Sequence, residues 1–100
     1  MEFFGPYREA ITELCRTHQV SSLYAFGSAA RNELNAESDI DLLVELKPTD
    51  PDAWADNYWD LETRLSSLFD RRVDLVSKRA LRNKYFIEAV ERTKVKLYEA

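Results

Sequence analysis

The sequence predicts an α/β domain of the α+β kind, in which a small mixed β-sheet is packed with helices. Its 100 residues, 45% of them hydrophobic, are the size of one domain with one core. Short apolar runs are interleaved with segments of helical periodicity, the pattern of strands and helices around a small sheet. Three prolines and two glycines leave little room for a linker. We therefore expect a single domain over residues 1–100, with the strand order left open.

The first half of the chain predicts one helix and two strands. Apolar residues recur at helical spacing over about residues 7–19, which indicates an amphipathic helix. Residues 23–26 are apolar and aromatic and stop at Gly27, as a buried strand entering a tight turn would. Residues 40–44 form a second run of this kind. The polar stretch between them, residues 28–38, suits turns better than a long regular element.

The second half predicts two helices and two strands. Asp50 can cap a helix and Pro51 suits its first position. The apolar residues that follow lie on one helical face and are Trp54, Tyr58, Leu61, Leu65 and Leu68. Residues 73–76 predict a third strand. Residues 80–92 predict a final helix whose apolar face presents Leu81, Tyr85, Ile87, Ala89 and Val90. Residues 94–98 alternate in polarity, which permits a short edge strand.

Composition narrows the function classes. Neither a signal segment nor an apolar run of about 18 residues is present, so we expect a soluble, untranslocated protein with no membrane partner. Cys15, the single cysteine, indicates a buried hydrophobe in a reducing, cytoplasmic compartment. The formal charge of −4 does not favour nucleic acid as a partner. Cationic residues do gather within residues 71–84, which we interpret as a solvated face.

Two single residues have ordinary structural interpretations. His18 lies near the end of the first helix, where a histidine interacts favourably with the helix dipole or packs more often than it binds a metal. Trp59 falls off the apolar stripe of its helix, so it is a candidate interface contact, although partial burial is the favoured interpretation.

Three aspartates stand inside or beside otherwise apolar strands. Asp39 and Asp41 flank Ile40, so their side chains point the same way with Cα atoms roughly 6.5–7 Å apart. Two carboxylates aimed at one spot repel each other unless a cation compensates them, which favours a hard divalent ion such as Mg²⁺. Asp74 completes the site if its strand pairs beside the second. The alternative is structural, with Asp39 in a turn and Asp74 at a solvated edge.

The segment upstream of the first aspartate pair favours the catalytic interpretation. Gly27 ends the first strand and has no Cβ, so backbone N–H groups near it can approach phosphate oxygens. Ser28 adds a hydroxyl donor, and Ser38 lies directly before the aspartate pair. Gly27 as a simple turn glycine is the ordinary alternative.

These segments together resemble a known family. The three segments are Gly27-Ser28-Ala29-Ala30-Arg31, Ser38-Asp39-Ile40-Asp41-Leu42 and Val73-Asp74-Leu75-Val76. They are similar to those of the minimal nucleotidyltransferases (MNT) of the DNA polymerase β superfamily, which include the MntA-like antitoxins encoded beside HEPN-domain toxins. The likeness covers nearly the whole chain and implies the nucleotidyltransferase fold, with a palm like that of polymerase β.

The resemblance also implies a reaction and residue roles. It implies transfer of AMP from ATP to an acceptor hydroxyl, with Asp39, Asp41 and Asp74 as catalytic residues and as ligands of two Mg²⁺ ions. It implies that Gly27, Ser28, Arg31 and Ser38 bind the nucleotide. For Arg31, a surface salt bridge is an equally good interpretation.

The identity of the acceptor stays open at the level of sequence. The leading hypothesis is an antitoxin-like enzyme that adenylylates a hydroxyl, expected to be a tyrosine, on a HEPN partner. The alternatives are nucleotidyl transfer to a small molecule or an RNA end, and a non-catalytic module that silences a partner by binding it. A domain this short has little room for a separate acceptor module, so we expect a partner chain or a second copy to complete the site.

Overall fold

A four-stranded mixed sheet organises the molecule. The computed structural model describes residues 3–31, 35 and 38–100. The strands are β1 (Val20–Phe26), β2 (Ile40–Leu46), β3 (Val73–Ser77) and β4 (Val95–Glu99), in the order β3-β2-β1-β4. β1 is antiparallel to both of its neighbours, whereas β2 and β3 are parallel. This arrangement confirms the predicted fold class.

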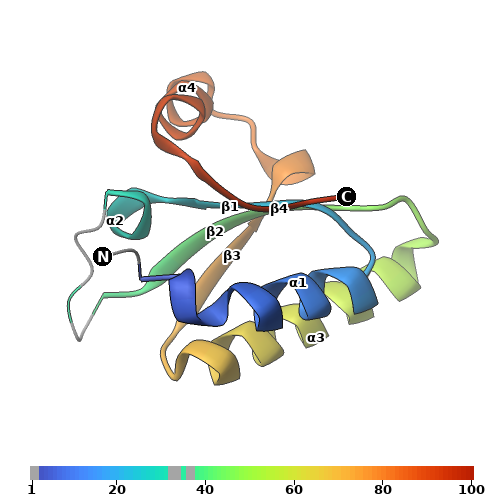
Figure 1. Ribbon diagram of the computed structural model, residues 1–100. Helices are drawn as coiled ribbons and strands as arrows, with labels where there is room; N and C mark the ends of the chain where they lie inside the picture. Colours follow the sequence, from blue (N-terminus) through green and yellow to red (C-terminus); the bar gives the residue numbers. More distant parts are fainter. Residues whose placement is uncertain (1–2, 32–34, 36–37) are drawn as a thin grey trace.

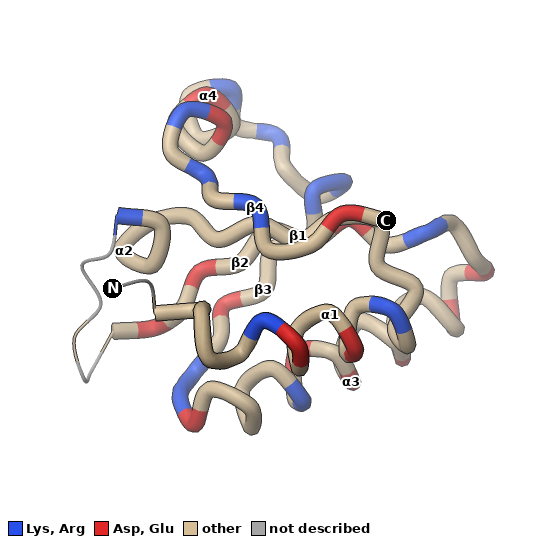
Figure 2. Tube along the Cα trace, viewed as in Figure 1, with Lys and Arg blue, Asp and Glu red and all other residues tan. Residues whose placement is uncertain are grey.

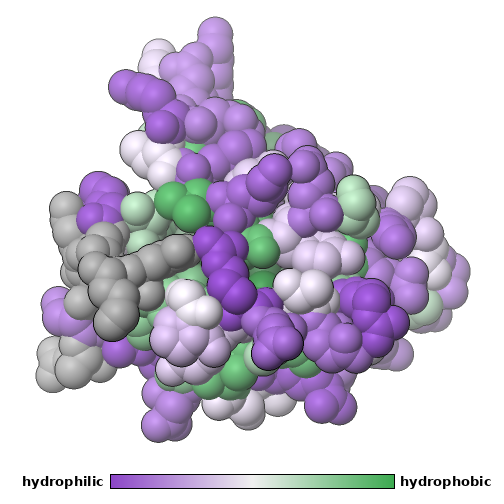
Figure 3. Space-filling view, viewed as in Figure 1, coloured by the Kyte–Doolittle hydropathy of each residue, from purple (hydrophilic) through white to green (hydrophobic). Residues whose placement is uncertain are grey.

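Helices cover the two faces of the sheet unequally. The helical segments are η1 (Gly5–Tyr7), α1 (Arg8–Thr17), α2 (Gly27–Ala30), α3 (Pro51–Phe69), η2 (Lys78–Ala80) and α4 (Lys84–Thr93). α1 and α3 lie together against one face, and α4 lies over the other (Figure 1). Seen from the same side, mostly hydrophilic residues cover α4 and α1, with hydrophobic patches between them (Figure 3). None of the described helices is both long and apolar enough to cross a membrane.

The main core lies between the sheet and the α1–α3 layer. Alternate residues of β2 point into it, so Ile40, Leu42 and Val44 are fully buried. From α3 come Leu61 and Leu65, both 0% exposed, at the spacing of one helical face. This confirms the stripe expected for that helix.

A smaller cluster lies on the opposite face, beneath α4. It consists of Phe26, Leu43 and Val90, with Tyr24, Val76 and Leu81 packed against it. Leu43 projects to this side because it alternates with the core residues of β2. The cluster therefore attaches α4 to part of this face only.

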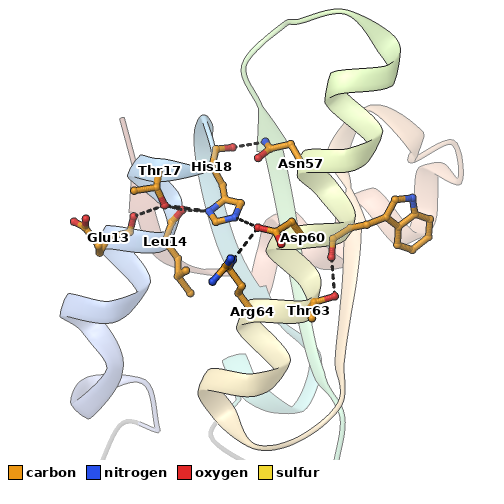
Figure 4. A network of polar contacts seen from close by, with 9 residues as sticks. Glu13, Leu14, Thr17, His18, Asn57, Asp60, Thr63 and Arg64 are labelled. Carbon is orange, nitrogen blue, oxygen red and sulfur yellow. Dashed lines mark hydrogen bonds and ion pairs between the residues drawn. The ribbon is translucent and has the colours of Figure 1, made fainter.

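A polar network joins α1 to α3 (Figure 4). His18 is 7% exposed, and its Nδ1 lies 2.8 Å from the carbonyl oxygen of Leu14 while its Nε2 lies 2.6 Å from Oδ2 of Asp60. Arg64 Nε donates to the same Asp60 oxygen over 2.8 Å. His18 thus packs at the end of its helix as expected, with its polar atoms satisfied.

Cys15 is fully buried in the main core. Burial raises the pKa of its thiol to about 12, because the apolar surroundings disfavour the thiolate. The predicted structural role of this cysteine is confirmed.

The structure corrects the sequence predictions at three places. Residues 27–30 form the short helix α2 and not a turn. The final helix begins at Lys84, because the Asn83 side chain accepts a hydrogen bond from the Phe86 N–H and caps it. Residues 81–83 are not helical. Tyr85, expected on the apolar face, is 81% exposed. Trp59 is 61% exposed, so the partial burial favoured for it is wrong.

Candidate functional site

Two of the three aspartates face each other across neighbouring strands. Asp41 of β2 is the register partner of Asp74 of β3 in the parallel pair. Parallel strands lie about 4.8 Å apart, and register partners point to the same face. The acidic segments of β2 and β3 accordingly lie side by side in Figure 2. Both carboxylates therefore occupy the face of the sheet that carries α4, and the condition set for Asp74, that its strand pairs beside β2, is met.

Gly27 lies directly against the Asp41 carboxylate. Phe26, the residue before it, is the antiparallel register partner of Asp41. A Cβ placed on Gly27 would lie 2.6 Å from Oδ2 of Asp41, closer than real Cβ contacts come. Gly27 also has a φ of +64°, which disfavours residues with a side chain. Two independent physical reasons therefore require glycine here, so Gly27 is more than an ordinary turn glycine.

Burial and neighbouring negative charge both act on the Asp41 carboxyl. Burial raises the pKa of the Asp41 carboxyl, and the negative charges of Asp74 and Asp39 raise it further. Arg31 opposes this shift, which places its positive charge within range of the site. A half-buried carboxylate surrounded by like charge is stabilised by added positive charge. The site thus favours a cation.

Asp39 is less closely held than Asp41. It precedes β2 by one residue and is exposed. Its Oδ2 lies 3.9 Å from Nε of Arg72, a long contact between two exposed groups. Across residues 3–31, 35 and 38–100, no three His, Cys, Asp or Glu side chains are gathered closely enough to ligate one ion. That all three aspartates share metal ions stays a prediction.

The donor set nevertheless fits a hard divalent cation. All three aspartates offer carboxylate oxygens, the ligands that Mg²⁺ prefers. Asp41 and Asp74 are aligned by strand register, and Asp39 sits on the exposed segment leading into β2. The repulsion that raises the Asp41 pKa is the kind that a bound cation relieves.

Two further predicted site residues, Ser28 and Arg31, follow Gly27 in the chain. Ser28 is half-buried in α2, directly after Gly27. Arg31 ends α2, and its backbone N–H donates to the Gly27 carbonyl over 3.2 Å. Both residues belong to α2 and its C-terminal cap, and α2 contacts β1 and β2. Their contact with a nucleotide stays a prediction.

Ser38 makes hydrogen bonds that stabilise the segment before β2. Its Oγ accepts a hydrogen bond from the Asn35 N–H over 3.2 Å. Arg71 donates to the carbonyl oxygens of Asn35 and Ser38, at 2.9 and 3.3 Å. These bonds hold the entry to β2 beside the entry to β3. The nucleotide-binding role predicted for Ser38 stays untested beside this one.

Two aromatic rings, which the sequence did not predict as part of the site, lie next to the row of carboxylates. The ring of Phe86, in the first turn of α4, meets the ring of Phe26 edge-to-face with centroids 5.6 Å apart. Phe26, Asp41 and Asp74 form one row across the sheet. The contact between Phe86 and Phe26 depends on where α4 packs against the sheet. The only signal for it in the local sequence is the aromatic pair Tyr85-Phe86, shortly after Asn83.

The chain matches a known family over nearly all its length. The family model for the nucleotidyltransferase domain matches residues 7–97. A protein of Methanocaldococcus jannaschii, named as a candidate protein adenylyltransferase, is 45% identical over 74 residues, which cover 74% of this chain and 72% of the relative. A second protein of the same organism and the same naming is 33% identical over 89 residues, covering 81% and 88%.

Solved structures with similar folds include antitoxin complexes. A candidate minimal nucleotidyltransferase superposes with a TM-score of 0.76 at 34% identity, covering 90% of this chain and 88% of the other. A toxin–antitoxin crystal structure with AMP-PNP gives 0.72 at 27% identity, covering 93% and 73%. A tri-AMPylated Shewanella oneidensis HEPN toxin in complex with an MNT antitoxin gives 0.63 at 26% identity, covering 93% and 70%.

Proposed function

Because this chain belongs to the nucleotidyltransferase domain family, we propose that it transfers AMP from ATP, with Mg²⁺, to a tyrosine hydroxyl of a HEPN-domain partner. The observation that carries the proposal is the register pairing of Asp41 with Asp74, with Gly27 pressed against the Asp41 carboxylate. The comparisons support it, since the relatives are named for adenylyl transfer to proteins and one similar structure contains an AMPylated HEPN toxin.

The proposed step exchanges one phosphorus–oxygen bond for another. The acceptor oxygen attacks the α-phosphorus of ATP, a new O–P bond forms, and the bond between the α- and β-phosphates breaks as pyrophosphate leaves. The hydroxyl proton passes to the Asp74 carboxylate, which is exposed on the open face and accessible to an acceptor. The products are the adenylylated tyrosine and pyrophosphate.

The chain's own residues hold the reactants in this scheme. Mg²⁺, held by Asp39, Asp41 and Asp74, would neutralise phosphate charge and polarise the reacting phosphoryl group. Gly27 lets the backbone of its segment approach the triphosphate, because no Cβ stands in the way. Ser28 donates a hydrogen bond to a phosphate oxygen. Arg31, whose charge already acts on Asp41, offsets the charge that develops on the leaving pyrophosphate.

The experiment is a transfer assay with a matched carboxylate control. The protein is incubated with Mg²⁺, α-labelled ATP and the protein encoded next to it in the genome, which we expect to contain a HEPN domain. The wild-type chain should label the partner, and Asp41→Asn should lower the rate by about 100-fold or more, since it removes charge stabilisation of the transition state. Glu45→Gln is the control, because Glu45 lies on the same face of β2 but four residues further along.

The remaining outcomes separate the alternative functions. Label on small molecules or RNA, with none on the partner, would show that the proposed acceptor is wrong. Silencing of the partner that survives Asp41→Asn would instead identify a non-catalytic binding module. Equal losses in Asp41→Asn and Glu45→Gln would contradict the assignment of the site.

A further inference from the structure

An exposed surface of mixed chemistry begins α4. It consists of Arg82, Lys84, Tyr85 and Phe86, and we call it the α4 entry surface. Tyr85 is 81% exposed and Phe86 is 39% exposed, so two large aromatic side chains face solvent at adjacent positions. Arg82 is held in place, because its Nη1 donates to the carbonyl oxygens of Arg79 and Leu81 at 2.7 and 3.0 Å. Exposed aromatics beside an ordered arginine are typical of interface anchors.

The α4 entry surface borders the carboxylate site. Phe86 contacts Phe26 edge-to-face, and Phe26 stands in the same row of the sheet as Asp41 and Asp74. Val90, one turn further along α4, packs into the cluster with Phe26 on that face. The Asn83 cap fixes where the helix starts and so where its first turn points. A molecule bound there would therefore have the reacting centre directly beside it.

The surface belongs to the basic part of an acidic chain. Residues 78–94 contain six lysines and arginines and two glutamates, whereas the whole chain has a net charge of −4. One of the two, Glu91, is already engaged: a hydrogen bond from Lys94 lowers its pKa, and the charge of Lys78 lowers it further. In Figure 2 basic segments run from the end of β3 along the path to α4. The α4 entry surface is therefore electrostatically complementary to an acidic partner.

We propose that the α4 entry surface docks an acidic segment of the acceptor protein, with Tyr85 as the apolar anchor, and so presents the acceptor hydroxyl to the carboxylates. The proposal rests on the proposed transfer reaction and adds the chemistry of the partner to it. Acidic side chains of the partner pair with Arg82 and Lys84. The delivered hydroxyl is neutral, so it enters the acidic centre without repulsion.

A protein segment fits this surface better than a nucleic acid does. A polynucleotide carries a phosphate at every residue, so a strand that reached the reacting centre would add its negative charge to that of the ATP phosphates and of Asp39, Asp41 and Asp74. A folded acceptor protein can keep its acidic residues next to Arg82 and Lys84 while only one side chain reaches the carboxylates. Tyr85 and Phe86 also offer apolar area of the kind that protein interfaces bury at their centre.

Fluorescence anisotropy with defined probes tests the docking step by itself. The probes are a fluorescein-labelled, glutamate-rich peptide with one tyrosine, a lysine-rich peptide of equal length, and an oligouridine of equal length. The acidic peptide should bind most tightly, and added salt should weaken it. The double variant Lys84→Glu with Tyr85→Ala should raise the Kd of the acidic peptide about tenfold or more. It removes the aromatic anchor and reverses one of the charges that pair with the peptide.

Lys47→Glu with Trp59→Ala is the matched control. It makes the same charge change and also removes an exposed aromatic, but Trp59 belongs to α3, in the helical layer on the other face of the sheet. The Kd of this control variant for the acidic peptide should match that of the wild type. Equal weakening in both double variants, tighter binding of the oligouridine, or no binding of the acidic peptide would each overturn the proposal.

Docking and transfer fail in different ways. The anisotropy measurement needs neither ATP nor Mg²⁺, so peptide binding without any labelling activity would contradict the proposed function and support the docking surface. Labelling of the HEPN partner that is unchanged in Lys84→Glu with Tyr85→Ala, at partner concentrations below KM, would overturn the docking surface and leave the transfer reaction in place. Circular dichroism of both double variants confirms that each is folded.

Discussion

One face of the sheet is covered by α1 and α3, whereas the other carries α4 and leaves Asp39 and Asp74 exposed. On the covered face, Leu61 and Leu65 pack against strand residues without solvent contact. The network around His18 is paired, because its two ring nitrogens lie within hydrogen-bond distance of the Leu14 carbonyl oxygen and the Asp60 carboxylate.

The other face is built in the opposite way. It places Asp41 opposite Asp74 and near Asp39, so that repulsion and burial together disfavour the charged form of Asp41. The difference indicates that the α1–α3 layer supplies most of the stability and that the acidic row is tolerated at some cost to it. Unfavourable arrangements of this kind concentrate at functional sites.

The largest expected effect on stability comes from the covered face. Leu61→Ala should lower the free energy of unfolding by about 3 kcal/mol, because it leaves a cavity in a close-packed core. For a domain of this size each kcal/mol shifts Tm by roughly 4–8 °C. Leu81→Ala, the same substitution beneath α4, should cost much less, since Leu81 is only partly buried. Equal shifts in thermal melts would refute the contrast between the faces.

Gly27→Ala should affect both stability and activity. The φ of +64° costs a residue with a Cβ about 1–2 kcal/mol. The added methyl would also push the Asp41 carboxylate aside, and a displacement of about 1 Å at a reacting centre can cost about 100-fold in rate. Urea unfolding and the transfer assay measure the two effects separately.

Gly5→Ala is the control for that prediction. A Cβ on Gly5 has no atom within 4 Å and its φ is not in the positive range, so both measurements should match the wild type. An active Gly27→Ala enzyme would mean that the contact between Gly27 and Asp41 does not matter for transfer.

The smallest expected effect is a pH dependence in the network between α1 and α3. Hydrogen bonds from His18 and Arg64 lower the pKa of Asp60. A lowered carboxyl pKa contributes stability above the unfolded value of about 3.9, and this stability is lost as pH falls through the folded value. Asp60→Asn should therefore lower the urea midpoint at pH 7. The difference from the wild-type midpoint should become progressively smaller below about pH 4. If the difference between the urea midpoints of the wild type and Asp60→Asn grew as the pH fell, the linkage would have the opposite sign and the prediction would be wrong.

The local features of this chain could be predicted because each depends on neighbouring residues. The Asp50 cap is one example, with its side chain accepting from the N–H groups of Asp52 and Ala53. The burial of Cys15 follows likewise from helical spacing. The apolar pattern predicts that the final helix begins at residue 80, whereas it begins at Lys84, because the side chain of Asn83 caps it there and Leu81 lies before the cap.

The sequence by itself determined that acidic residues would stand in apolar strands beside a glycine, and hence that a cation-binding site was worth expecting. Tertiary structure alone decided that β3 pairs in parallel with β2, that the Gly27 backbone touches Asp41, and that α4 brings Phe86 onto Phe26. The reason is physical. Alternation and capping are set within a few residues of chain, whereas strand pairing and helix placement depend on which distant surfaces can be buried together.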